Sequence, residues 1–102
     1  GDGHLLSVFP GSPALAPDAP LAMGIPAPTH IQPHLPRVTF SPSILRLAGH
    51  VMPIMAGAAK AAILSEIFGA ERDPERWPSQ LALSRNATWV LDPAAAAGLP
   101  RD

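Results

Sequence analysis

A strand followed by a helix is encoded in residues 37–49, which read RVTFSPSILRLAG. Polar and apolar residues alternate over the first four positions, and this alternation predicts a short strand. Ser41 and Pro42 then supply an N-cap oxygen and a proline at the first helical position, and Gly49 is a typical helix end. The apolar face of this helix consists of Ile44, Leu45 and Ala48.

A second strand and helix are expected over residues 50–68. The run 50–56, HVMPIMA, is short and apolar, which is typical of a buried strand, although Pro53 cannot donate a backbone hydrogen bond to a sheet. Residues 58–68 are rich in alanine and repeat apolar side chains at helical spacing up to a stop at Gly69. The apolar stripe of this helix consists of Ile63, Leu64, Ile67 and Phe68.

The last strand and helix are expected after residue 87. Residues 88–91, TWVL, favour a short strand, and Asp92 and Pro93 are typical of a helix start that Gly98 would close. Strands that alternate with helices predict an α/β domain with a largely parallel sheet and flanking helices.

The first part of the chain has a different character, because nine of the 14 prolines lie within residues 1–42. Each proline fixes φ and lacks an N–H, so long helices and central strands are disfavoured there. We therefore expect residues 11–36 to form a proline-rich loop that runs over the surface or frames a cleft.

Composition narrows the class of protein. The 102 residues suit one domain, and a hydrophobic share of 47% excludes a disordered tail. The absence of cysteine excludes disulfide scaffolds, thiolate zinc sites and cysteine nucleophiles. A formal net charge of -1 lacks the basic footprint of nucleic-acid binding, so no nucleic-acid partner is expected. The most apolar stretch, residues 47–59, is too short to span a bilayer, so no membrane partner is expected.

Two groups of residues could carry chemistry. Asp2 and His4 flank a glycine, so the carboxylate can orient the imidazole beside a ligand. Lys60 follows Gly57 at a helix start, where free backbone N–H groups attract anions, and Arg37 opens a strand after the proline-rich loop. Each of these side chains has a structural alternative, because loop histidines, solvated lysines and surface arginines are common in any fold.

His30 and His34 have a spacing that metal sites use on helices. Pro28, Pro33 and Pro36 prevent the helix that would place both rings on one face. Because the sequence also lacks cysteine and a nearby pair of carboxylates, no metal site is expected.

Four segments together resemble a known family. Residues 2–11, DGHLLSVFPG, resemble the signature Asp-Gly-His-x-x-Ser-x-Phe-Pro-Gly of the lactonase branch of the glucosamine-6-phosphate isomerase/6-phosphogluconolactonase family. Further matches follow in the family's order: PRVTF at 36–40, GAAKA at 57–61 and ATWVLD at 87–92. The resemblance implies a Rossmann-like, doubly wound α/β fold, and the matches correspond to the C-terminal part of the family's proteins.

The resemblance also implies an activity. It implies hydrolysis of 6-phospho-D-glucono-1,5-lactone to 6-phosphogluconate in the pentose phosphate pathway, with His4 as the base that activates water and Asp2 as the group that holds its ring. Lys60 and Arg37 are implied to bind the phosphate of this sugar-phosphate substrate. The resemblance implies no metal and no organic cofactor, and a cytoplasmic location is expected.

Two alternatives stay open. Glucosamine-6-phosphate deaminases share the fold, but their motif resembles Asp-Gly-His-x-x-x-x-Glu-Pro, and Phe9 stands where that glutamate would be. Since phenylalanine cannot transfer protons, the resemblance favours lactone hydrolysis. The second alternative is a non-catalytic segment that binds a phosphosugar, or a module that binds a protein partner through its proline-rich loop.

The sequence has no initiator Met and no leader segment, so we expect its first residue to lie inside a longer protein. Residues 1–102 are then expected to be a single, partial α/β domain that has no activity alone. An open edge of its parallel sheet would favour homo-oligomers or other association.

Overall fold

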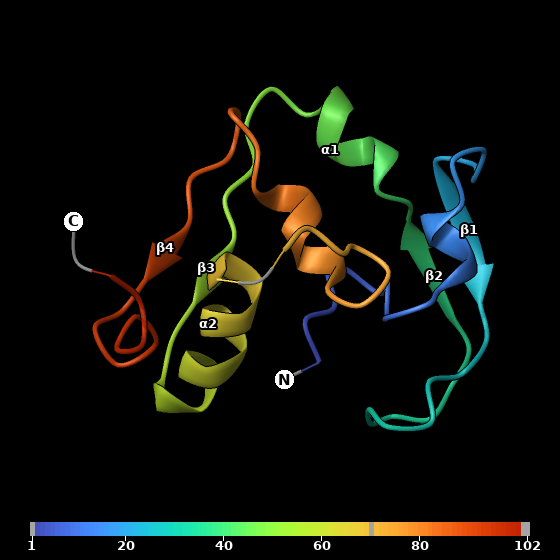
Figure 1. The fold of residues 1–102 in the computed structure, drawn as a ribbon. Coiled ribbons are helices and arrows are strands. Elements are labelled where there is room, and N and C mark those ends of the chain that lie inside the picture. Colours follow the sequence, from blue (N-terminus) through green and yellow to red (C-terminus); the bar gives the residue numbers. More distant parts are fainter. Residues whose placement is uncertain (1, 70, 101–102) are drawn as a thin grey trace.

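The computed structural model describes residues 2–69 and 71–100 (Figure 1). The strands are β1 (Ala22–Ile25), β2 (Arg37–Phe40), β3 (Ile54–Met55) and β4 (Val90–Leu91). The helices are α1 (Ser43–Leu47) and α2 (Ala61–Gly69), and the 3-10 helices are η1 (Pro13–Leu15), η2 (Ala58–Lys60) and η3 (Pro78–Ala82). Strands β1 and β2 lie on one side of the molecule and β3, β4 and α2 on the other, with η3 between them (Figure 1).

The proline-rich loop contains a strand that the sequence does not predict. β1 pairs with β2 in antiparallel orientation, with Ala22 opposite Phe40 and Ile25 opposite Arg37. The strand can form because residues 21–25 lack proline, so every N–H in this window is able to join a sheet. The loop region expected over 11–36 therefore includes one short strand, and this antiparallel pair differs from the largely parallel sheet that is predicted.

Strand β2 has the predicted residues, and its polar residue Thr39 is the one that faces inward. Thr39 is only 5% exposed, whereas Val38 is 80% exposed and Phe40 also faces solvent. The Thr39 hydroxyl accepts the N–H of Ser7 at 3.1 Å and donates to the carbonyl of Phe40 at 2.9 Å, so its burial leaves no unpaired hydroxyl. The buried threonine thereby joins β2 to the N-terminal segment.

Helix α1 is shorter than predicted. Its first residue is Ser43, and the expected cap, Ser41, is instead buried with its hydroxyl 2.9 Å from that of Ser43. The helix ends at Leu47 because Ala48 adopts an extended conformation before Gly49 is reached. No residue of α1 is buried, so its apolar face contributes little to the core.

β3 and β4 form the parallel pair that the alternation of strands and helices predicts. Ile54 lies opposite Val90, and an isolated bridge joins Val51 to Ala87. Pro53 interrupts the ladder because it has no N–H, although its carbonyl accepts the N–H of Val90 at 2.8 Å. The expected burial of this strand is wrong, since Ile54 is 70% exposed. Association through this edge stays a prediction.

The two remaining predicted helices have different outcomes. The helix over 58–68 is confirmed as η2 followed by α2. The prediction of a helix after Asp92 is wrong, because residues 93–98 form successive turns. The predicted cap is nevertheless present, since Oδ1 of Asp92 accepts the N–H of Ala95 at 2.8 Å. None of the helices in the described part of the chain is both long and apolar enough to cross a membrane.

Helix α2 contacts η3, an element that the sequence does not predict, and both contribute buried residues to the core. Gln80 of η3 is only 3% exposed, and its amide donates to the carbonyls of Ile67 at 3.2 Å and Glu71 at 3.1 Å. Its side-chain carbonyl accepts the N–H of Asp73 at 2.6 Å, so the burial of this polar group is compensated. The apolar residues with no exposed surface are Val8, Ala14, Leu64, Ile67, Ala82 and Ala95.

Candidate active site

Asp2 and His4 form a hydrogen-bonded pair in the N-terminal segment. Nδ1 of the His4 ring lies 2.6 Å from Oδ1 of Asp2, and the backbone N–H of His4 donates to the same oxygen at 3.1 Å. An ionised carboxylate only accepts hydrogen bonds, so Nδ1 must carry the proton of the neutral ring. Nε2 of His4 then has the lone pair, which is what a general base uses.

Helix η3 fixes the backbone that carries this pair. Ser79 is 1% exposed, and it donates its N–H to the carbonyl of Gly3 at 2.9 Å and its hydroxyl to the carbonyl of His4 at 2.8 Å. Gly3 has a φ of 78°, and a Cβ atom there would lie 3.0 Å from Cδ1 of Trp77. The left-handed φ and the close approach of the indole both require glycine at this position.

A second histidine completes the hydrogen bonding of Asp2, and the sequence gives no sign of this role. Nε2 of His30 lies 2.6 Å from Oδ2 of Asp2, although the two residues are 28 positions apart in the chain. Burial on its own would raise the pKa of Asp2, but the hydrogen bonds from His30 and His4 outweigh it and lower this pKa to about 2. Asp2 is therefore ionised near neutral pH and accepts hydrogen bonds from both rings.

Phe9 lies close to both imidazole rings and to the arginine predicted for the site. The centroid of its ring is 4.8 Å from that of His4 and 5.5 Å from that of His30, which it meets nearly edge-on at 84°. The Arg37 guanidinium lies 5.5 Å from the same centroid, within cation–π range, and donates to the carbonyl of Pro33 at 3.1 Å. The Phe9 ring is thus a common neighbour of His4, His30 and Arg37.

A cavity of about 200 Å³ brings together three of the four predicted site residues, Asp2, His4 and Lys60. Lys60 is the only cationic side chain among the lining residues, and it reaches the cavity from the end of η2. Arg37 is not part of this lining. The other lining residues are Gly3, Ile31, Met55, Ile63 and Ile67. A larger cavity beside η1 and α1, of about 300 Å³, contains none of the predicted site residues.

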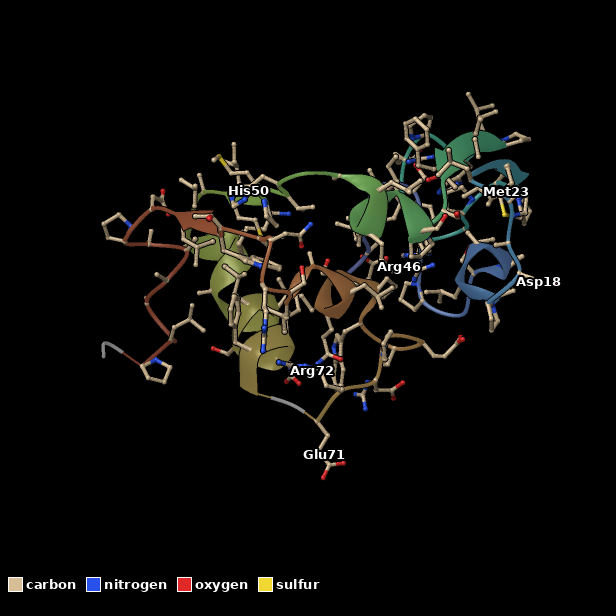
Figure 2. The ribbon with its side chains drawn as sticks, turned by 90° about the horizontal axis from the view of Figure 1, so that it is seen from above. Asp18, Met23, Arg46, His50, Glu71 and Arg72 are labelled. Atoms are coloured by element: carbon tan, nitrogen blue, oxygen red, sulfur yellow. The ribbon has the colours of Figure 1, made fainter. Side chains whose placement is uncertain are left out.

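Several other charged side chains lie at the periphery of the molecule. Asp18 after η1, Arg46 on α1 and Glu71 after α2 are exposed (Figure 2). None of them lines the cavity of Asp2, His4 and Lys60. An anionic group of a ligand in this cavity would therefore be attracted first to Lys60.

The anion site expected at the Gly57 backbone is occupied by the protein itself. The N–H of Gly57 donates to both carboxylate oxygens of Asp92 at 3.1 Å. Backbone hydrogen bonds from Ala95 and then from Gly57 lower the pKa of Asp92. A phosphate beside this carboxylate would be repelled, so the expectation is wrong for the N–H of Gly57, and anion binding by the side chain of Lys60 stays a prediction.

Within residues 2–69 and 71–100, no group of three or more histidine, aspartate or glutamate side chains is arranged to hold a metal ion. The rings of His4 and His30 each direct one nitrogen at Asp2 instead. His34, which the sequence pairs with His30, is exposed and lies outside the cavity lining.

Known proteins are similar in sequence to this chain over most of its length. A family model described as glucosamine-6-phosphate isomerases/6-phosphogluconolactonase matches residues 1–91. A 6-phosphogluconolactonase of Synechocystis sp. is 34% identical over 100 residues, which cover 96% of this chain and 39% of that protein. A 6-phosphogluconolactonase of Rattus norvegicus is 34% identical over 99 residues, which cover 93% of this chain and 36% of that protein.

The fold is shared as well. The crystal structure of 6-phosphogluconolactonase from Leishmania guyanensis matches with a TM-score of 0.78 and 28% sequence identity, over 98% of this chain and 39% of that one. The predicted fold class, α/β and Rossmann-like, is confirmed by this match. The chain spans about two fifths of the length of the relatives that it matches.

Proposed function

This chain belongs to the family of glucosamine-6-phosphate isomerases and 6-phosphogluconolactonases, and we propose that it is part of an enzyme of that family. The proposed enzyme hydrolyses 6-phospho-D-glucono-1,5-lactone to 6-phosphogluconate. Relatives named 6-phosphogluconolactonase support the lactonase branch of the family. In this proposal, residues 1–102 are a part of one α/β domain, and residues 11–36 are its proline-rich region.

The observation that carries the proposal is the cavity that Asp2, His4 and Lys60 share. It combines an imidazole whose Nε2 is free, a carboxylate that holds the ring, and a cation that can bind a phosphate. A phosphorylated lactone would use all three groups, because hydrolysis of its carbonyl needs an activated water molecule and its phosphate needs a cation. The phosphate bound to Lys60 would position the carbonyl near His4.

His4 acts as general base and then as general acid. Its Nε2 removes a proton from a water molecule while the water oxygen forms a bond to the lactone carbonyl carbon. When the tetrahedral intermediate collapses, the bond between this carbon and the ring oxygen breaks, and Nε2 returns the proton to the departing oxygen. Asp2 stabilises the imidazolium ion that exists between these two steps. The steps balance in atoms and charge without a metal or organic cofactor.

Arg37 is proposed as a second phosphate ligand. One of its nitrogens donates to the carbonyl of Pro33, but a guanidinium has five N–H donors, so others remain for a substrate. Its position over Phe9 places it beside the imidazole cluster and outside the lining of the cavity. We therefore expect Arg37 to contribute less to phosphate binding than Lys60 does.

Deamination of glucosamine 6-phosphate is the alternative within the same family. Phe9 is 8% exposed and packs against the His4 ring, so no carboxylate from this position can reach the substrate. A third possibility is a site that binds a phosphosugar without reaction. The absence of an acidic side chain at residue 9 favours hydrolysis over deamination.

The natural full-length protein tests the proposal when it is supplied separately with 6-phosphogluconolactone and with glucosamine 6-phosphate. We expect 6-phosphogluconate to form faster than by spontaneous hydrolysis, and no ammonia to be released. Ammonia release would establish the deaminase alternative. Binding of 6-phosphogluconate without acceleration of hydrolysis would establish a non-catalytic site.

A further inference from the structure

His30 makes a contact that the proposed reaction does not use. It lies in the proline-rich region, and its Nε2 is 2.6 Å from Oδ2 of Asp2. We infer that His30 is a positioning residue, which holds the Asp2 carboxylate in the orientation that His4 requires. The inference rests on the proposed function, because it assigns His30 a role in the same reaction.

The two oxygens of Asp2 have different partners. Oδ1 accepts both the ring Nδ1–H and the backbone N–H of His4, while Oδ2 accepts from His30. A carboxylate bonded through one oxygen can still rotate about its Cβ–Cγ bond, whereas a carboxylate bonded through both oxygens cannot. His30 therefore removes the rotation that would weaken the hydrogen bond to Nδ1 of His4 and release the ring from its productive tautomer.

The tautomer of His30 follows from the same contact. Since the ionised Asp2 only accepts hydrogen bonds, Nε2 of His30 must carry a proton whether the ring is neutral or charged. The contact consequently needs an N–H at this position and not a positive charge. A side chain that presents a neutral N–H at the same distance from the backbone should replace it.

Two further contacts hold His30 in place. The imidazole ring of His30 packs against the ring of Phe9 in an edge-on contact, with the ring centroids 5.5 Å apart. The loop that carries it is tied to β2 where Arg37 donates to the carbonyl of Pro33. Although the His30 side chain is 47% exposed, it is thus constrained from two sides, as a positioning residue needs to be.

Three variants of the natural full-length protein test the inference. His30→Ala removes the N–H, His30→Gln keeps an N–H near the position of Nε2, and His34→Ala removes an exposed histidine from the same loop as the matched control. We expect His30→Ala to lower kcat about tenfold with KM changed less than about twofold, as for loss of one hydrogen bond to a charged group. His30→Gln should recover most of kcat, and His34→Ala should match the wild type.

A purely structural role for His30 would give a different pattern. It would lower thermal stability in His30→Ala while leaving kcat of the folded fraction unchanged, and this result would overturn the inference. Equal loss of kcat in His30→Gln and His30→Ala would overturn it too, because the Nε2–H would then not be what matters.

An NMR measurement separates this inference from the proposed function. In the 15N-labelled wild-type protein, we expect a slowly exchanging Nε2–H resonance of His30 that disappears in Asp2→Ala. If the resonance is present and lactone is not hydrolysed, the proposed function fails while the contact stands. If lactone is hydrolysed and the resonance is absent in the wild type, the inference fails and the function stands.

Discussion

Nδ1 of His4 lies 2.6 Å from Oδ1 of Asp2, and the two residues are separated only by Gly3. A pair so close in sequence is assembled by local backbone geometry, because the left-handed φ of 78° at Gly3 turns the His4 ring back toward the carboxylate. The long-range contribution comes from Ser79, whose N–H and hydroxyl hold the carbonyls of Gly3 and His4.

Asp2→Asn should lower kcat because an amide can donate as well as accept, so it no longer enforces the Nδ1–H tautomer of His4. We expect a fall of about a hundredfold, measured by steady-state hydrolysis of the lactone at neutral pH. Asp18→Asn, a change of the same kind at an exposed residue beside η1, is the control and should leave kcat as in the wild type. A fully active Asp2→Asn enzyme would contradict the role of this carboxylate.

The low pKa of Asp2 predicts how the stability of the fold depends on acid. This pKa is about 2 in the folded chain, below the ordinary value of 3.8, so the carboxylate binds fewer protons folded than unfolded in this range. Its stabilising contribution is complete above pH 4 or so and is lost as pH falls toward about 2. Thermal unfolding between these values should show a steeper loss of Tm in the wild type than in Asp2→Asn. Parallel curves would show that Asp2 is not hydrogen-bonded in this way.

Gly3→Ala should destabilise the fold for two reasons. The added Cβ would lie 3.0 Å from Cδ1 of Trp77, and φ is positive. We expect a loss of about 2–3 kcal/mol in the free energy of unfolding, measured by urea denaturation. Gly11→Ala is the matched control, since its φ of 72° is also positive but nothing lies within 4 Å of the new Cβ, and about 1 kcal/mol is expected. Equal losses in the two variants would exclude the Trp77 contact as a constraint.

Lys60→Ala should act on substrate binding more than on the chemical step. Lys60 is the cation of the cavity, so its removal should raise KM about tenfold or more while kcat changes little. Arg46→Ala removes an exposed cation on α1 that does not line this cavity and should leave KM as it is. A large fall in kcat at unchanged KM would place Lys60 in the chemical step instead.

The sequence predicted the elements whose signal is local. The strand over 37–40 and the helical segment over 58–68 are present, because alternation and helical spacing are properties of a few adjacent residues. The orientation of β2 could not be predicted in this way. Thr39 points inward because it has hydrogen-bonding partners, Ser7 and Phe40, that periodicity does not reveal.

The missed elements depend on contacts between distant segments. η3 carries polar residues without a helical period, and Ser79 and Gln80 are buried only because the N-terminal segment and α2 supply their partners. The helix predicted after Asp92 is absent for a related reason. Its capping carboxylate also accepts the N–H of Gly57, 35 positions away in the chain, so this segment is tied to the residue that precedes η2.

The candidate site likewise contains residues that the sequence predicts and one residue, His30, that only a long-range contact reveals. Asp2, His4 and Lys60 were predicted from residue types and motif order, and the structure places them around one cavity. The sequence relates His30 only to His34, by a spacing that metal sites use, because spacing cannot show that a residue 28 positions away in the chain returns to Asp2. The one signal that could have indicated it is a histidine inside the proline-rich loop that follows the Asp-Gly-His motif.

The role of His4 as general base is tested by the kcat/KM of His4→Ala for 6-phosphogluconolactone, measured in the natural full-length protein with correction for spontaneous hydrolysis. His50→Ala is the control, because His50 is an exposed histidine that contacts Thr88 outside the cavity. We expect kcat/KM to fall at least about a hundredfold in His4→Ala and to stay at the wild-type value in His50→Ala. Equal lactone hydrolysis by His4→Ala and the wild type would contradict the account.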